Sequence, residues 1–235
     1  MELSERILYE DNHLIAVNKL PSEIVQGDST GDEPLASRVA RFIKGRDGKP
    51  GNVFLGIPHR IDRPSSGIVL FAKTEKALSR ISGMFKERRV KKCYWIVLDA
   101  PPPADRGELV HFLRKDGTKN KSFASQKQRS GAKEAKLAYE LIAATSRYYL
   151  VEVELLTGRH HQIRAQFAAV GCHVKGDLKY GAPRSNPGGG IHLHARRLEF
   201  IHPVRKTSVQ IIAPPPKEVL WDVFASMASD SGDSR

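Results

Sequence analysis

The chain has little of several features that mark particular protein classes. Its 235 residues include two cysteines, Cys93 and Cys172, too few for a disulfide framework and without the C-x-x-C spacing of a zinc site. We expect both to be buried thiols. No run of about 18 apolar residues exists, and the acidic, polar N-terminus does not resemble a signal peptide. We therefore expect a cytoplasmic location and no membrane partner.

Positive charge is what the sequence has in excess. Lys and Arg number 38 against 26 Asp and Glu, which gives a net charge of +12, and 40% of the residues are hydrophobic. Residues 51–200 carry a net +14, whereas residues 1–50 carry −2. A basic block with neutral or acidic ends is typical of a face that binds a polyanion. Charge alone does not distinguish RNA from DNA or a membrane, and a solvated surface without a partner is the alternative.

Hydrophobic patterning predicts an α+β fold: one domain over residues 1–228, with a mixed, largely antiparallel sheet and flanking helices. Residues 229–235 are small and polar, and we expect a disordered tail there. Helices are expected from Pro34 to before Gly45, after an N-cap at Thr74, over 161–170 with Gly171 following, and around 219–224. Strands are expected at 7–9, 14–17, 67–72, 94–98, 137–143, 148–156, 192–200 and 208–212.

One candidate for chemistry is the stretch from His59 to Gly67, which leads into an apolar run. It places Asp62 between Arg60 and Arg63. Neighbouring cations favour the ionised carboxylate, which would keep it available as a nucleophile or base. A turn-capping Asp, or one paired with Arg63, is the alternative, and spacing alone favours that alternative.

Two further stretches combine polar residues with glycine or aromatics. Residues 157–164 (TGRHHQIR) lie at an expected strand-to-helix junction, where free backbone N–H groups and arginines could hold an anion. Residues 86–95 (KERRVKKCYW) interleave cations with aromatics, as suits an RNA backbone and its bases. No carboxylate or cysteine completes a ligand set with the nearby histidines, so we expect no metal.

Taken together, these stretches resemble the RluA-type pseudouridine synthases, which rearrange uridine in ribosomal and transfer RNA. The resemblance runs from about Ile7 to Phe224, and the order of its elements makes it more specific than any single one. The matching elements are residues 18–19 (NK), 59–67 (HRIDRPSSG), 92–94 (KCY), 157–164, 176–181 (GDLKYG), 193–195 (LHA) and 202–203 (HP). Since residues 1–6 leave little room for it, we expect no S4-like domain of the kind that many relatives carry ahead of the catalytic domain.

The resemblance implies a catalytic group in which Asp62 is the nucleophile or base, Tyr94 stacks on the uracil, and Arg164 pairs with Asp62. It implies no cofactor, an RNA partner that is ribosomal or transfer RNA, and a monomer by default. The implied substrate-binding residues are Arg60, which could fill the vacated base stack, Ile61 and Leu193 as apolar walls, and His161, Lys92, Arg88 and Arg89. The expected phosphate contacts lie in residues 86–92 and at Arg114, Lys115, Lys119, Lys121, Lys127 and Arg129.

Two other functions stay open at this point. A non-catalytic RNA-binding protein or chaperone would need the positive charge and Tyr94 but not Asp62. A histidine-based phosphodiesterase or metal-dependent hydrolase would cleave RNA and would be sensitive to chelators. The resemblance favours an isomerase over both, and it leaves the modified RNA and the order of bond making and breaking unassigned.

Overall fold

A computed structural model describes residues 2–28 and 30–232. The backbone divides into two compact units. The first consists of Met1–Lys91 with Ala195–Pro214, and the second of Lys92–His194 with Pro215–Arg235. Each unit is described by itself below, and the expected single domain over residues 1–228 stays a prediction.

The first unit is built on a sheet whose central strands are buried on both faces. Strands β2 and β3 alternate side chains between two faces, yet every hydrophobic side chain in them is fully buried. The strand order is β1-β2-β3-β9, with β10 paired to β9. The β1–β2, β2–β3 and β9–β10 pairs are antiparallel. The strands are β1 (Ile7–Glu10), β2 (Leu14–Lys19), β3 (Ser66–Ala72), β9 (Leu193–Ile201) and β10 (Ser208–Ile212).

Helices of the first unit begin and end close to the predicted positions. Helix α2 (Glu75–Lys86) is capped as expected, since Thr74 Oγ1 accepts a hydrogen bond from the Ala77 backbone N–H at 3.2 Å. Its buried Ile81 packs in one cluster with β2, β3, β9 and β10 side chains. Helix α1 (Leu35–Arg46) runs through Gly45 and ends two residues beyond its expected end. A short 3-10 helix, η1 (Ser4–Arg6), precedes β1.

The second unit contains a wholly antiparallel set of strands in the order β4-β8-β7-β5-β6. The expected pairing of residues 137–143 with 148–156 is confirmed by β7 and β8. Strands β5 and β6 were not predicted individually. The strands are β4 (Lys91–Leu98), β5 (Arg106–Asp116), β6 (Lys121–Ser125), β7 (Lys133–Ala144) and β8 (Tyr149–Leu155).

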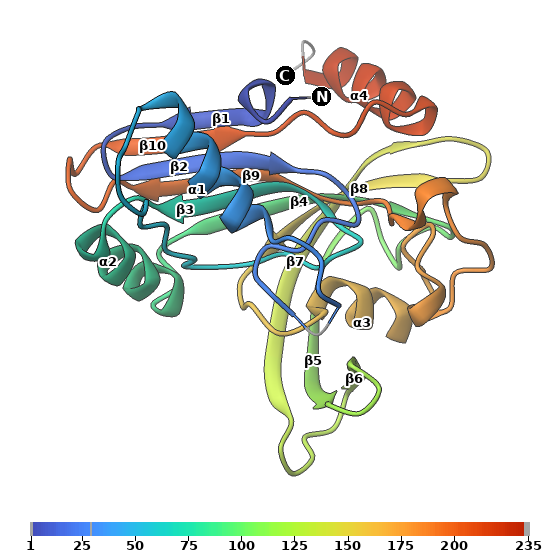
Figure 1. Cartoon of the computed structure of the whole chain (residues 1–235). Helices are drawn as coiled ribbons and strands as arrows, with labels where there is room; N and C mark the ends of the chain where they lie inside the picture. The colour runs from blue at the N-terminus through green and yellow to red at the C-terminus, as the bar shows by residue number, and fades with distance from the viewer. Residues whose placement is uncertain (1, 29, 233–235) are drawn as a thin grey trace. The chain divides into compact units, whose positions relative to one another are not determined.

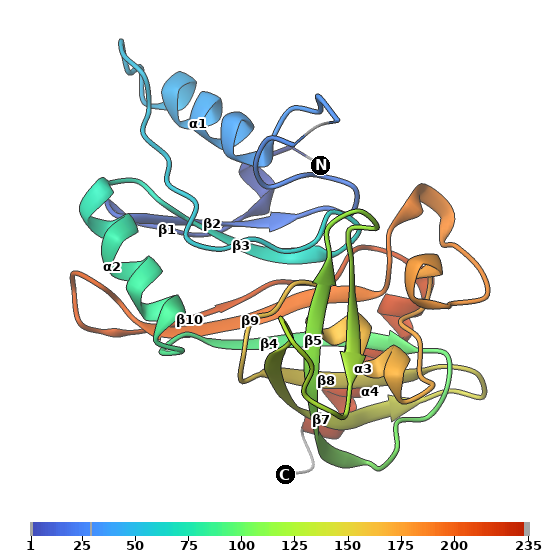
Figure 2. The same cartoon turned by 90° about the horizontal axis from the view of Figure 1, so that it is seen from below.

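Two helices cover opposite faces of this second set of strands. Phe167 of α3 (Gln162–Ala169) shares a buried cluster with Ile96 of β4 and Val153 of β8. Phe224 of α4 (Val219–Gly232) clusters with Val97, whose side chain points to the other face. Figures 1 and 2 show α3 beside β5 and β6. Short 3-10 helices are η2 (Leu178–Tyr180) and η3 (Pro187–Gly189).

The α+β fold and its mostly antiparallel sheet are therefore confirmed. Gly171 follows α3 with φ +81°, as expected of a glycine that ends a helix. The expected disorder from residue 229 is wrong for residues 229–232, which continue α4, and residues 233–235 lie outside the described part. Cys93 and Cys172 are buried thiols.

The described residues contain neither a helix suited to a membrane nor a cluster of metal-ligating side chains. In residues 2–28 and 30–232, no helix has both the length and the apolar composition needed to cross a membrane. Across the same ranges, no three His, Cys, Asp or Glu side chains group as a metal site.

Candidate active site

Asp62 lies in the first unit, on the loop that leads into β3. Its backbone carbonyl accepts a hydrogen bond from the Ser65 N–H at 3.1 Å, which closes a tight turn. The Asp62 side chain is partly exposed, whereas Ile61 before it is 9% exposed. The loop is thus anchored by the buried Ile61 and Ser65, with the partly exposed Asp62 between them.

Gly67 explains how this turn enters the sheet. Its φ is +110°, and a Cβ at this position would lie 2.4 Å from the backbone oxygen of Ala195 in β9. Both the left-handed conformation and the close approach of two backbones require glycine. The glycine therefore fixes where β3 begins, and with it the position of the Asp62 turn.

His59 supports the same loop from its other end. Its Nε2 accepts a hydrogen bond from the Leu70 backbone N–H of β3 at 2.9 Å, which requires the tautomer with the proton on Nδ1. Its ring stacks on Phe85 of α2 with centroids 4.6 Å apart. The imidazole thus ties the chain before Asp62 to both β3 and α2.

Lys19 is a fully buried cation at the end of β2. Its Nζ donates to the backbone carbonyls of Leu20, Glu23 and Arg63 at 2.9, 2.8 and 3.0 Å. Burial lowers the pKa of Lys19 to about 7, while the nearby Glu23 and Asp62 carboxylates act in the opposite direction. The lysine therefore holds the backbone next to Asp62 and brings a positive charge near it.

The expected substrate-binding arginines of the first unit are all exposed. Arg88 and Arg89 follow α2, and Arg89 pairs with Glu87 at 2.6 Å. Arg63 forms an ion pair with Asp32 at 2.5 Å. Arg60 forms no ion pair with any carboxylate in the described residues, so it is the loop cation available for an outside anion.

Tyr94 lies in the second unit, on the face of β4 that α3 covers. It packs, partly buried, against the cluster that contains Leu193 and Ile163, the neighbour of Arg164. Two residues earlier, Lys92 extends toward the 157–164 loop, with its Nζ 3.7 Å from where a Gly158 Cβ would stand. Strand alternation therefore puts the Tyr94 ring, Leu193 and the start of α3 on one face.

Arg164 is 4% exposed and is held by a buried carboxylate, Asp177. Its Nε donates to Asp177 Oδ2 at 2.6 Å and its Nη2 to Oδ1 at 2.8 Å. The Tyr180 ring lies 4.9 Å from the guanidinium carbon. Such bidentate pairing fixes the plane of the guanidinium as well as its charge. The expected pairing of Arg164 with Asp62 joins the two units and stays a prediction.

His161 stands at the start of α3 with φ +53°. Its Nδ1 lies 3.0 Å from the Tyr180 hydroxyl, and its ring stacks on His160 with centroids 3.8 Å apart. The Tyr180 hydroxyl accepts from the Ser122 backbone N–H at 2.8 Å. His161 and Arg164 thus contact the same tyrosine from successive turns of α3.

The structure therefore assembles two groups, one in each unit. Asp62 with Ile61 belongs to the first, and Tyr94, Leu193, Lys92, His161 and Arg164 belong to the second. Sequence reasoning assigned no role to Lys19, His59 or Asp177, although all three stood within the family-like elements. Lys19 follows the apolar run 14–17, which is a signal for a buried cation, whereas no apolar run adjoins Asp177.

Comparison with known proteins identifies the family. The model for the RNA pseudouridylate synthase family matches residues 13–169, more than half of the chain. An uncharacterized RNA pseudouridine synthase of Synechocystis is 31% identical over 89% of this chain and 65% of its own length. The ribosomal large subunit pseudouridine synthase C of Vibrio cholerae is 30% identical over 91% of this chain and 66% of its own length. The chain thus spans about two thirds of these relatives.

Solved structures show the same fold. A human protein described as RNA pseudouridylate synthase domain containing 4 has a TM-score of 0.78 at 22% identity and covers 97% of this chain and 94% of its own. The human domain containing 1 protein has a TM-score of 0.71 at 24% identity, over 93% of this chain and 86% of its own. Because the family model matches residues 13–169, which include Asp62 and Arg164, the chain belongs to the RNA pseudouridylate synthase family.

Proposed function

We propose that this chain converts specific uridines of ribosomal or transfer RNA to pseudouridine, with Asp62 as the nucleophile or base. The observation that carries the proposal is the family match over residues 13–169, which contains Asp62, Tyr94 and Arg164. Relatives named for the ribosomal large subunit favour ribosomal RNA as the substrate class.

The reaction is an isomerisation, so its atoms balance within one nucleotide. The N1–C1′ glycosidic bond breaks, the uracil rotates, a C5–C1′ bond forms, and the C5 proton is lost while N1 gains one. We assign the opening of the reaction to Asp62, as attacking carboxylate or as base. Tyr94 would stack on the detached uracil and relay the proton from C5.

Arg164 would keep the Asp62 carboxylate ionised and aimed. A carboxylate in an apolar pocket otherwise binds a proton and loses its nucleophilicity, whereas a guanidinium partner favours the charged form. The hold of Asp177 on two guanidinium nitrogens supports this role, because it fixes the orientation of Arg164 in advance. Ile61 and Leu193, both buried, would supply the apolar walls.

The target uridine must leave its stack to reach such residues. Extrusion costs a few kcal/mol and is cheapest in loops and single strands. Arg60, exposed and two residues before Asp62, would fill the vacated stack. Arg88, Arg89, Lys92 and His161 would contact the flanking phosphates. A cytoplasmic location and a monomeric state stay predictions.

The test is the Asp62→Asn variant, which removes the negative charge of the side chain but keeps its size and shape. We expect pseudouridine formation to disappear while RNA affinity stays within about twofold, because the amide retains the size but not the charge. Asp47→Asn, an exposed carboxylate after α1, is the matched control and should keep full activity. Pseudouridine formed by Asp62→Asn would overturn the assignment of Asp62.

The RNA itself is identified by mapping pseudouridine in ribosomal and transfer RNA from cells with and without this gene. Sites present only with the gene define the substrate. RNA binding by the wild-type protein without any such site would favour the non-catalytic RNA-binding alternative.

A further inference from the structure

A segment of the second unit carries positive charge that nothing in the described chain neutralises. Residues 114–133, from the end of β5 through β6 to β7, form what we call the cationic hairpin. In these residues Asp116 is the single acidic side chain. The seven cations, none of which forms an ion pair with any described carboxylate, are Arg114, Lys115, Lys119, Lys121, Lys127, Arg129 and Lys133.

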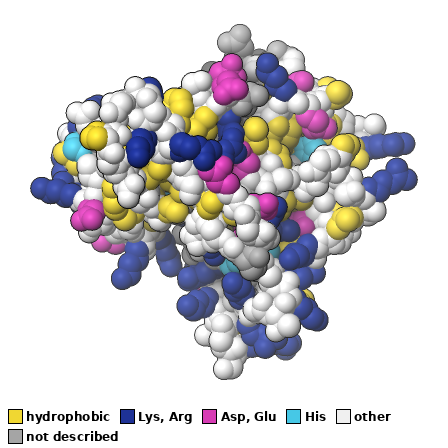
Figure 3. Space-filling view, viewed as in Figure 1, with side chains coloured by type: hydrophobic (Ala, Val, Ile, Leu, Met, Phe, Trp, Pro, Cys, Tyr) yellow, Lys and Arg dark blue, Asp and Glu magenta, His cyan; other side chains and the backbone are white. Residues whose placement is uncertain are grey.

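Figure 3 shows Lys and Arg side chains gathered on the projecting part of the second unit where Figure 1 places β5 and β6. Six of the seven cations are exposed, and Lys121 is partly buried. Like charges held this close repel one another, which a protein tolerates where an anionic partner offsets the repulsion. The hairpin is therefore a candidate surface for a polyanion.

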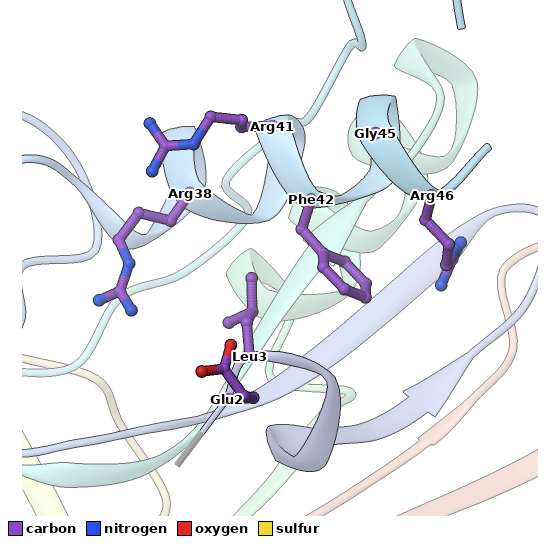
Figure 4. Close-up of a pocket in the computed structure, with 7 residues that line it drawn as sticks. All are labelled: Glu2, Leu3, Arg38, Arg41, Phe42, Gly45 and Arg46. Carbon is purple, nitrogen blue, oxygen red and sulfur yellow. The ribbon is translucent and has the colours of Figure 1, made fainter. Parts of the chain in front are cut away.

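A pocket on α1 provides the contrast. It measures about 530 Å³, and the residues that line it are Glu2, Leu3, Arg38, Arg41, Phe42, Gly45 and Arg46 (Figure 4). Arg38 pairs there with Glu23, Arg41 with Glu33, and Arg46 with Glu10. Each of these cations already has a carboxylate, so the pocket does not attract an outside anion. The two surfaces therefore differ in whether carboxylates pair with their cations, and not in the number of arginines that they carry.

An aromatic side chain stands in the middle of the cationic hairpin. Phe123 of β6 is 41% exposed, on the outer face where Arg114 of β5 is its cross-strand partner. The Lys121 ammonium lies 5.6 Å from the Phe123 ring centre. On the same outer face, Val110 is 40% exposed. An exposed ring bordered by cations offers a stacking surface for a base and charges for its phosphates.

The inner face of the hairpin is anchored. Leu113 and Ala124 pack with Ala165 of α3 and with Tyr180. The Ser122 backbone N–H donates to the Tyr180 hydroxyl at 2.8 Å. The outer face is therefore presented on a fixed support, which lowers the entropy lost when a ligand binds.

We propose that the cationic hairpin binds a single-stranded segment of RNA, with a base stacked on Phe123 and phosphates held by Arg114, Lys119 and Lys127. This rests on the proposed action on RNA and assigns part of its recognition to a named surface. Single strands fit better than duplexes because their bases are free to stack on an aromatic ring.

The test measures RNA binding separately from chemistry. Fluorescence anisotropy follows a short labelled single-stranded RNA with wild type, with Phe123→Ala, and with Lys119→Gln/Lys127→Gln. The matched controls are Phe54→Ala, whose ring is 40% exposed in the first unit, and Lys44→Gln/Lys76→Gln, exposed lysines of α1 and α2. Pseudouridine formation is assayed in parallel, and thermal melts verify that each variant is folded.

We expect each hairpin variant to lose about tenfold in affinity for the single strand, with the controls within about twofold and with Phe123→Trp restoring binding. The assignment of RNA binding to the hairpin would be overturned if the hairpin variants kept their affinity, or if the controls lost as much affinity as they do. Either result would leave the proposed function unaffected. A wild-type protein that binds through the hairpin but forms no pseudouridine would instead overturn the proposed function alone.

Discussion

At the scale of single residues, two buried ionisable side chains hold the surroundings of the candidate catalytic residues in place. Lys19 donates to three backbone carbonyls around the Asp62 loop, and Asp177 holds two nitrogens of Arg164. Each charge is costly to bury unless its partners are in place. Each therefore couples the stability of the fold to the geometry of a candidate catalytic residue.

Lys19 gives stability a defined pH dependence. Its pKa is about 7 in the folded chain against an ordinary value of 10.5, so above pH 7 the unfolded state binds more protons. The free energy of unfolding contributed by Lys19 therefore rises from pH 7 to pH 9, by at most about 1.4 kcal/mol per pH unit. We expect the stability of wild type relative to Lys19→Met to increase over this range.

Urea unfolding of both proteins at pH 7, 8 and 9 measures this difference. Lys44→Met, at an exposed position of α1, is the control and should keep a constant offset from wild type. A Lys19→Met offset that does not change with pH would show that Lys19 keeps its charge when folded.

Asp177→Ala should lower the free energy of unfolding by about 3–5 kcal/mol, because it removes the buried carboxylate that pairs with two nitrogens of the buried Arg164. The double variant Arg164→Met/Asp177→Leu removes both charges and should recover much of that loss while remaining inactive. Urea unfolding measures the first effect and the pseudouridine assay the second. A loss below about 1 kcal/mol for Asp177→Ala would place this pair among those that matter little for stability.

At the scale of elements, the backbone requires glycine at some positions, whereas at others alanine would fit equally well. Gly67→Ala should destabilise the first unit by more than about 2 kcal/mol, since its φ is +110° and its Cβ would overlap Ala195. Gly45→Ala, within α1 with nothing within 4 Å, should stabilise by about 0.5–1 kcal/mol. Thermal melts compare the two, and equal shifts would contradict the close approach of β3 and β9.

The elements also show what the sequence could predict. Apolar runs such as Ile68–Phe71 and the helical spacing of Ile81 located β3 and α2 within a residue or two, because their burial is nearly complete. Strand β5 escaped prediction because its apolar residues do not alternate. The inner face includes the polar His111, while the outer face carries the apolar Val110.

The sequence predicted the candidate catalytic residues but not the residues that hold them in position. Asp62, Tyr94 and Arg164 followed from the resemblance, whereas the partners of Arg164 and His59 depend on contacts between distant parts of the chain. Asp177 lies 13 residues from Arg164, and Leu70 lies 11 residues from His59. No local pattern encodes such pairs, since turn and loop geometry decides which side chains meet.

At the scale of the whole molecule, the +12 charge is distributed between compensated and uncompensated cations. Arginines of α1 are matched by Glu10, Glu23 and Glu33, while the cationic hairpin has no such partners among the described residues. Total charge draws RNA toward the molecule from any direction. Only cations that meet phosphates release counterions, so salt dependence distinguishes the two groups.

Lys119→Gln/Lys127→Gln should therefore reduce the slope of log affinity against log salt by about 1.4, which is two contacts at about 0.7 each for a single strand. Lys44→Gln/Lys76→Gln removes the same charge from the first unit and should leave the slope unchanged, although it lowers the attraction at a distance equally. Anisotropy titrations at several salt concentrations supply both slopes. If both double variants reduced the slope equally, RNA binding would depend on the total charge of the protein. If the slope of the hairpin variant did not change, the RNA phosphates would contact other residues.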